Sequence, residues 1–149
     1  MNLAALQFPT FQPYQEAAVE IYLSGCMRRC KNCHNPELVD FNFGKKLDYE
    51  EVLKYLKERE DLFRVISITG GDPLPQDLEG LHKFIAFLTT HFPLKLFWLF
   101  TGAEFEEVPK WCLRYFSCIK VGKYIIEEKQ EGFPASKNQK VWRKGKDYE

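Results

Sequence analysis

The chain is organised around the stretch AVEIYLSGC at residues 18–26, an apolar run typical of a strand that breaks at a serine and a glycine and enters a cysteine-rich loop. Three cysteines follow with the spacing Cys26-x3-Cys30-x2-Cys33. A structural zinc site or an electron-transfer iron–sulfur cluster normally takes four protein ligands. A compact group of three thiolates therefore indicates a metal site with one coordination position left open for a molecule that reacts.

Apolar runs typical of strands alternate with segments of helical periodicity along the rest of the chain. Asp48 is predicted to cap the first helix, and the second helix is expected to start near Asp77. This order predicts an α/β fold with a parallel sheet and right-handed crossovers, in one domain over residues 1–149 with a lead-in at 1–17 and a polar segment at 123–149. Strands are expected at residues 18–23, 65–69, 95–100 and 118–121, and helices at residues 48–60, 77–92 and 108–115.

A glycine-containing or polar segment follows each predicted strand. Because active and binding sites in such sheets lie at the carboxyl ends of the strands, we expect these segments to face one cavity. Gly70 and Gly71 lack a Cβ and can expose backbone groups to a zwitterion or a phosphate, although the same pair also suits an ordinary strand-to-helix turn. The segments are the cysteine loop, Gly70-Gly71-Asp72-Pro73-Leu74, Thr101-Gly102 and Gly122-Lys123-Tyr124.

The composition argues against several classes of function. Twenty-one basic residues balance 21 acidic ones, so neither nucleic acid nor an anionic membrane is expected as the main partner. No window reaches the length of a membrane span, and Met1–Gln7 lacks a basic region followed by a long apolar run, so we expect a cytoplasmic protein. The cysteines number five, an odd number, and three of them crowd into one loop, which suits metal thiolates in a reducing compartment.

The segment Cys26 to Cys33 resembles the cysteine signature of the radical S-adenosylmethionine superfamily, and Gly70 to Leu74 resembles its glycine-rich second motif. More closely, the chain is similar from about Val19 to Trp142 to the small activating proteins of anaerobic (class III) ribonucleotide reductase. The resemblance implies an open, partial (β/α) barrel-like sheet that is smaller than a full radical S-adenosylmethionine barrel. The closer similarity rests on Cys33-His34-Asn35-Pro36, Thr101-Gly102, Ile119-Lys120-Val121-Gly122-Lys123-Tyr124 and Ser136-Lys137-Asn138-Gln139.

The resemblance also implies a cofactor site. Cys26, Cys30 and Cys33 would each bind one iron of a [4Fe-4S] cluster, and the fourth iron would bind the amino nitrogen and the carboxylate of S-adenosylmethionine. The methionine part of that cofactor would be held by Gly70, Gly71 and Asp72, and its ribose and adenine would lie near Asn32, His34, Asn35 and Thr101.

By the same resemblance, the chain would be a radical S-adenosylmethionine oxidoreductase with no catalytic side chain beyond the cluster and the cofactor. An electron from a low-potential donor such as flavodoxin or ferredoxin would split S-adenosylmethionine into methionine and a 5′-deoxyadenosyl radical. That radical would take a hydrogen atom from the α-carbon of a glycine in anaerobic ribonucleotide reductase and leave a glycyl radical there.

Two alternatives stay open at the level of sequence. Cys26, Cys30, Cys33 and His34 could instead bind zinc in a non-enzymatic interaction module. A radical enzyme with the same two motifs could also act on a small molecule, as the deazaguanine-forming enzymes do. The remaining candidates are expected to be buried or partly buried residues with structural roles, namely Cys112, Cys118 and His82.

Overall fold

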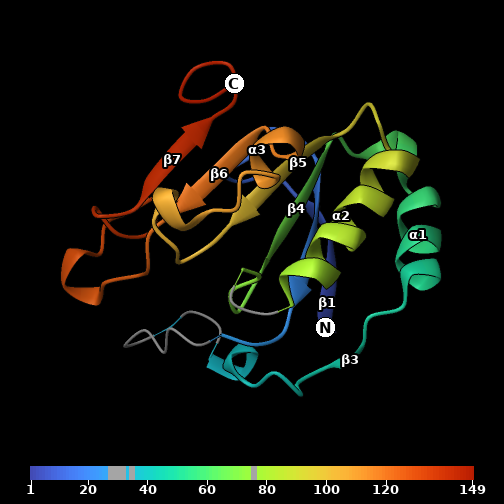
Figure 1. The fold of residues 1–149 in the computed structure, drawn as a ribbon, viewed down its shortest axis with the longest axis horizontal. Coiled ribbons are helices and arrows are strands. Elements are labelled where there is room, and N and C mark those ends of the chain that lie inside the picture. The colour runs from blue at the N-terminus through green and yellow to red at the C-terminus, as the bar shows by residue number, and fades with distance from the viewer. Residues whose placement is uncertain (27–32, 34–35, 75–76) are drawn as a thin grey trace.

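The computed structural model describes residues 1–26, 33, 36–74 and 77–149, and it arranges their strands in one seven-stranded sheet of order β3-β1-β2-β4-β5-β6-β7 (Figure 1). The strands are β1 (Asn2–Thr10), β2 (Ala18–Leu23), β3 (Lys45–Lys46), β4 (Val65–Gly70), β5 (Leu96–Phe100), β6 (Cys118–Val121) and β7 (Lys140–Arg143). The helices are α1 (Tyr49–Lys57), α2 (Leu78–His91) and α3 (Cys112–Tyr115), with 3-10 turns at Pro36–Val39, Glu60–Leu62, Phe105–Glu107 and Ile126–Glu128.

The centre of the sheet is parallel, as the strand-helix order predicts. Strands β2, β4, β5 and β6 pair in parallel, whereas β1, β3 and β7 join antiparallel at the flanks. The sheet has two edges, at β3 and β7, and therefore does not close into a barrel. This confirms an α/β fold with an open, partial sheet and adds antiparallel flanks that the sequence did not predict. Residues 1–17, expected as a lead-in, contain β1.

The first two helices begin where their capping residues predict. The Asp48 carboxylate accepts hydrogen bonds from the N–H groups of Glu50 and Glu51, and the Asp77 carboxylate accepts one from Gly80. An aspartate at this position satisfies donors that have no partner inside the helix. Helix α1 ends at Lys57, three residues before the expected end near Glu60, where the chain instead enters a 3-10 turn.

The third helix is shorter than its apolar pattern predicted. Regular α-helix covers only Cys112–Tyr115, although we expected residues 108–115. The preceding residues make turn hydrogen bonds, from the Cys112 N–H to the Pro109 carbonyl and from the Leu113 N–H to the Lys110 carbonyl. The prediction of a longer helix was wrong because apolar spacing alone does not distinguish a helix from successive turns around a proline.

The two faces of the sheet are covered differently. The main core lies on the face that α1, α2 and α3 cover, where side chains such as Ile21, Ile68 and Leu99 meet Leu56 and Leu88. A smaller cluster lies on the other face, which carries no helix from this set, and contains Tyr14, Ala18, Val65, Trp98 and Cys118. The face without helices therefore stays open toward the carboxyl ends of the strands.

Three residues that the sequence assigned to structural roles occupy such positions. Cys112 and Cys118 are buried, at 0% and 1% exposure, which confirms the prediction that they belong to the core. His82 is partly buried and stacks on Trp111 with ring centres 4.3 Å apart. Each of the three is therefore explained by packing.

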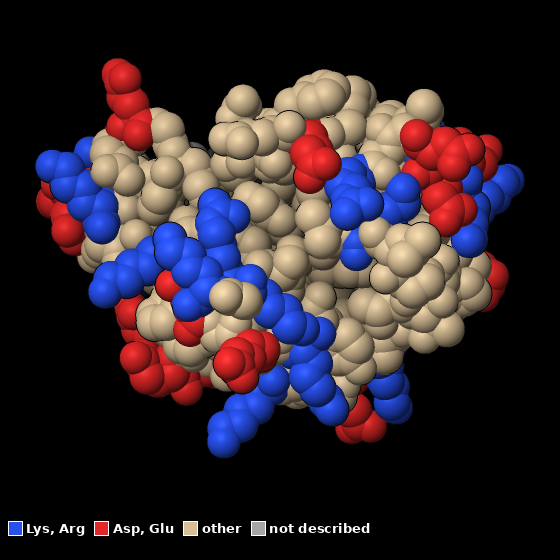
Figure 2. Space-filling model, turned by 90° about the horizontal axis from the view of Figure 1, so that it is seen from above, with Lys and Arg blue, Asp and Glu red and all other residues tan. Residues whose placement is uncertain are grey.

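The surface carries charges of both signs. Figure 2 shows a band of lysine and arginine side chains across the face seen from above, with aspartate and glutamate groups on either side of it. This mixture agrees with the balanced composition of the chain. Among the described residues, none of the helices has the length and apolar character needed to cross a membrane.

Candidate functional site

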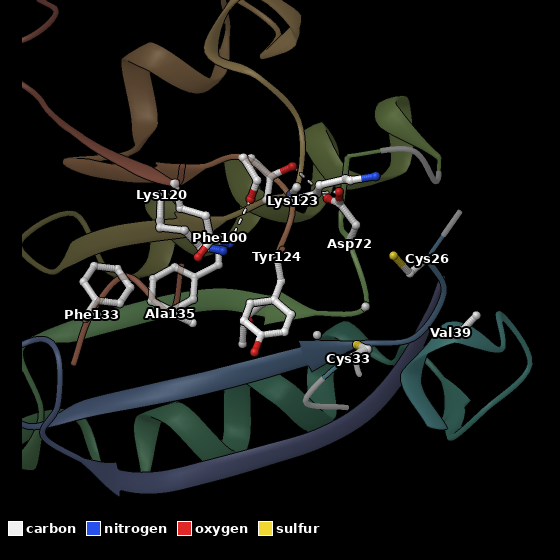
Figure 3. A pocket seen from close by; sticks show the side chains of 17 residues that line it. Cys26, Cys33, Val39, Asp72, Phe100, Lys120, Lys123, Tyr124, Phe133 and Ala135 are labelled. Atoms are coloured by element: carbon white, nitrogen blue, oxygen red, sulfur yellow. Dashed lines mark hydrogen bonds between the residues drawn. The ribbon is translucent and has the colours of Figure 1, made fainter. Parts of the chain in front are cut away.

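A cavity of about 260 Å³ lies at the carboxyl ends of the parallel strands (Figure 3). Every parallel strand contributes to it, either through its last residues or through the loop that follows, as expected for this type of sheet. The lining residues come from four segments: Cys26, Cys33 and Val39; Thr69 to Asp72; Phe100 to Gly102; and Lys120, Gly122 to Tyr124, Phe133, Ala135 and Gln139.

The entry to the cysteine loop is held by the 3-10 segment Pro36–Val39. Gly25 donates its N–H to the Leu38 carbonyl at 2.6 Å, and Cys26 donates to the Val39 carbonyl at 3.2 Å. These bonds fix the chain on either side of the loop, so that Cys26 and Cys33 line the same cavity. Figure 3 shows both sulfur atoms at one end of it.

Four predicted site residues lie outside the described part of the chain, namely Cys30, Asn32, His34 and Asn35. Among the described residues, no three histidine, cysteine, aspartate or glutamate side chains group as metal ligands. Two thiol side chains in one cavity nevertheless suit a soft metal centre, because thiolates select zinc or iron–sulfur clusters over magnesium or calcium. The described donors thus fit the iron–sulfur cluster that the family resemblance implies.

Gly70 and Gly71 line the cavity. Both positions require glycine because neighbouring backbone leaves no room for a side chain. Gly70 has a φ of +126°, and a Cβ there would collide with the Leu23 carbonyl. A Cβ on Gly71 would collide with the carbonyl oxygens of Gly25 and Leu38. The glycine pair therefore allows the β4 loop to pack directly against the entry of the cysteine loop, in addition to its place in the cavity wall.

Asp72 joins three loops of the site. Its carboxylate accepts hydrogen bonds from the Thr101 hydroxyl at 2.8 Å, the Gly102 N–H at 2.9 Å and the Leu74 N–H at 3.2 Å. Its own N–H donates to the Gly25 carbonyl at 2.8 Å. Asp72 and Thr101 are 1% and 2% exposed. The structure thus brings together the predicted residues Gly70, Gly71, Asp72 and Thr101, and it connects the last two directly.

A further wall comes from β6 and the segment after it, which the predicted set of site residues did not include. Lys120, Tyr124, Phe133, Ala135 and Gln139 line the cavity from this side. One signal in the sequence pointed to this wall, because Gly122-Lys123-Tyr124 follows a predicted strand. Phe133 had no such signal, since it is a lone aromatic residue in a polar stretch far along the chain from any strand end.

Comparison with known proteins agrees with this site. Residues 17–142 match the family described as 4Fe-4S single cluster domain, a range that includes every residue lining the cavity. The anaerobic ribonucleoside-triphosphate reductase-activating protein of Vibrio cholerae is 30% identical over 132 residues, which cover 83% of this chain and 85% of that protein.

The chain belongs to this family of activating proteins.

Other members are similar over comparable lengths. The activating protein of Enterobacteria phage T4 is 28% identical over 133 residues, covering 83% of this chain and 82% of the relative. The activating protein of Escherichia coli K12 is 27% identical over 130 residues, which cover 83% of this chain and 80% of the relative. Family membership and the two cysteines in one cavity therefore point independently to an iron–sulfur centre.

Proposed function

We propose that this protein is a radical S-adenosylmethionine enzyme that generates a glycyl radical on anaerobic ribonucleotide reductase. Its relatives are named as activating proteins of anaerobic ribonucleoside-triphosphate reductase, which supports the choice of partner. The observation that carries the proposal is the single cavity in which Cys26 and Cys33 meet the Gly70 to Asp72 loop at the ends of parallel strands. The family match extends across this whole site.

The residues of the chain divide the task of holding the cofactors. Cys26 and Cys33, together with Cys30, would hold a [4Fe-4S] cluster, and the Gly70 to Asp72 loop and Thr101 would hold S-adenosylmethionine beside it. Asn32, His34 and Asn35 stay proposed neighbours of its ribose and adenine. When bound, the cluster and S-adenosylmethionine supply the radical chemistry, which no side chain of the protein could perform.

The protein contributes binding, orientation and exclusion of water. Asp72 holds the β4 loop, the β5 loop and the entry of the cysteine loop in one arrangement through four hydrogen bonds. Because its carboxylate accepts three of these bonds inside the protein, we assign Asp72 the task of positioning the cavity wall. Phe100 and Phe133 cover part of the cavity with apolar surface, which limits the access of water to a reactive centre.

The partner, the electron donor and the location of the protein follow from the proposed activity. The substrate is a glycine of anaerobic ribonucleotide reductase, and a small low-potential protein such as flavodoxin or ferredoxin supplies the electron. Both would meet this chain in the cytoplasm. A zinc-binding module of Cys26, Cys30, Cys33 and His34 would need neither partner, so metal analysis separates the two functions.

The test begins with protein purified without oxygen. We expect about four irons and four sulfides per chain, and loss of both in Cys26→Ala and Cys33→Ala. Cys112→Ala is the control, because Cys112 is buried in the main core. Addition of S-adenosylmethionine should change the electron paramagnetic resonance (EPR) spectrum of the reduced cluster, and the cognate reductase should then acquire a glycyl radical. Stoichiometric zinc without sulfide would refute the proposal.

A further inference from the structure

The cavity has two ends with different chemistry. Cys26, Cys33 and Asp72 lie at one end, and Phe100 and Phe133 lie at the other, with the Tyr124 ring projecting between them (Figure 3). The cluster and S-adenosylmethionine account for the first end. The aromatic end needs a separate explanation.

The aromatic end sits on the face of the sheet that carries no helix. Phe100 pairs with Lys120 across β5 and β6, and Phe133 packs on Phe100 with ring centres 5.4 Å apart. Tyr124 and Phe133 are only partly buried and both line the cavity, so a molecule in the cavity would contact them. Among the described lining residues, those of this end include no carboxylate and no imidazole, and its charged group is Lys120, whose Nζ lies 5.6 Å from the centre of the Phe100 ring, whereas Lys123 lies beside Asp72 (Figure 3).

Buried hydrogen bonds hold this wall in place. Gln139 donates from Nε2 to the Gly122 carbonyl at 2.9 Å and accepts from the Ser136 N–H at 3.1 Å. The Ser136 hydroxyl accepts from the Ile125 N–H at 3.3 Å. Ser136 and Gln139 are 0% and 6% exposed. We call this group of bonds the Ser136–Gln139 clasp. It joins the two ends of the segment 122–139, so the segment presents Tyr124 and Phe133 in a preformed arrangement.

We propose, on the basis of the proposed function, that the aromatic end is the binding site for the glycine-bearing loop of the reductase. Tyr124 and Phe133 contact the backbone of that loop, and Ser136 and Gln139 position them.

Four properties of this end favour a peptide backbone as its ligand. A glycine has no side chain, so its α-carbon and the flanking peptide groups can lie directly against aromatic ring faces. An ammonium group such as that of Lys120 carries three hydrogen-bond donors and complements the carbonyl oxygens of an extended chain. Removing a hydrogen atom from carbon requires no acid or base, which agrees with the lack of carboxylate and imidazole groups among the described lining residues of this end. A preformed wall also reduces the ordering cost of binding a flexible loop.

The test measures the affinity of the cluster-loaded protein for the purified cognate reductase by biolayer interferometry without oxygen. The variants Phe133→Ala and Tyr124→Ala should each raise the dissociation constant about tenfold or more, because truncated aromatic anchors commonly dominate an interface. The reductase concentration that gives half of the maximal glycyl-radical signal should rise in parallel. The control is Phe11→Ala, which removes a ring that is 56% exposed in the loop between β1 and β2. It should match the parent in both measurements.

Several results would overturn the proposal. Parental affinity in both folded variants, with folding checked by circular dichroism, would remove the wall from the interface. Loss of the EPR change caused by S-adenosylmethionine, with unchanged affinity for the reductase, would assign the wall to the cofactor. If the parent protein itself gives no glycyl radical on the reductase, the proposed function fails and this inference fails with it.

Discussion

Asp72 illustrates, at the scale of a residue, how one buried carboxylate can hold the loops of a site in one arrangement. Its three acceptor bonds reach Thr101, Gly102 and Leu74, and these bonds are buried or partly buried. A buried carboxylate is costly unless donors surround it, and here the donors come from two separate loops. The sequence predicted Asp72 at the site from its motif, but a motif cannot show whether a side chain faces a ligand or its own protein.

We predict that Asp72→Asn destabilises the protein by about 1–3 kcal/mol. The amide NH₂ group would face a hydrogen-bond donor in place of the carboxylate oxygen that now accepts its bond. For a chain of this size, the melting temperature should fall by about 2–4 °C for each kcal/mol. Thermal unfolding of the cluster-free protein measures the effect. Asp40→Asn is the control, since the Asp40 carboxylate accepts one exposed backbone bond. An unchanged melting temperature in Asp72→Asn would contradict the role of Asp72 as the joint between loops.

Gly71→Ala should damage the cluster site as well as the fold. The added methyl group would collide with the carbonyl oxygens of Gly25 and Leu38, and overpacking of this kind costs about 1–3 kcal/mol. Because Gly25 directly precedes Cys26, we expect less iron per chain after anaerobic reconstitution. The control is Gly132→Ala, where a Cβ meets no atom within 4 Å; its φ of +81° adds backbone strain there, but the substitution places no atom against the cysteine loop, so the iron content should stay at the parental level. Full iron content in Gly71→Ala would show that the loop can shift without moving the cysteine.

The segment 122–139 shows, at the scale of an element, how irregular chain can form a defined wall. Only Ile126–Glu128 within it has regular helical geometry, as a 3-10 turn. Side-chain bonds to the backbone replace the ladder of a strand or the periodic bonds of a helix. Ser136 and Gln139 belong to the Ser136-Lys137-Asn138-Gln139 stretch that carried part of the family resemblance, and the clasp gives these two residues a structural explanation.

Gln139→Glu should open this segment. The carboxylate would face the Gly122 carbonyl, so the buried bond at 2.9 Å would be replaced by a repulsive contact between two acceptors. We expect trypsin to cleave at Lys123 or Lys129 roughly five times faster or more, because local opening would become less costly. Peptide mapping after limited proteolysis identifies the sites. Gln7→Glu, at an exposed position on β1, should leave the cleavage rate unchanged. Equal rates in both variants would argue against the clasp.

The sequence predicted the strands that have a clear local pattern and missed those whose conformation depends on pairing with a neighbouring strand. The strands β2, β4, β5 and β6 were recognisable because each is a short apolar run closed by a turn residue. Strand β1 has one buried residue, Leu3, and takes its conformation from pairing with β2. Its apolar pattern was therefore too weak to reveal it, and Pro9 argued against a strand.

The same difference explains which parts of the site were predictable. Strand ends bring Gly70, Gly71 and Thr101 to one edge, so their meeting with the cysteine loop followed from the order of elements. Phe133 reaches the cavity only because the chain returns from β6 before forming β7. Such a return leaves no periodic pattern in the sequence, and the polar composition of the segment does not indicate which of its residues faces the cavity.

At the scale of the whole molecule, the stability of the fold depends on buried thiol and phenol groups that stay protonated. Burial raises the pKa of Cys112 to about 12 and that of Cys118 to about 11. Burial also raises the pKa of Tyr14 and of Tyr22, and both hydroxyls donate to the Glu20 carboxylate, at 2.5 Å and 2.8 Å, which raises each pKa further. In the unfolded chain these groups lose their protons at lower pH, so deprotonation favours unfolding as the pH rises.

We therefore predict that the cluster-free protein loses stability in alkali, beginning near the ordinary thiol pKa of 9.0 and continuing toward 12 for Cys112. In this window the unfolded chain binds fewer protons than the folded one, so Cys112 alone should lower the free energy of unfolding by about 1.4 kcal/mol per pH unit. Urea unfolding at a series of pH values measures this slope. Cys112→Ala should reduce the slope by that amount. Val52→Ala, which removes core packing but no titratable group, should lower stability at every pH and keep the parental slope. If Cys112→Ala also keeps the parental slope, the buried thiol does not contribute to the alkaline loss of stability.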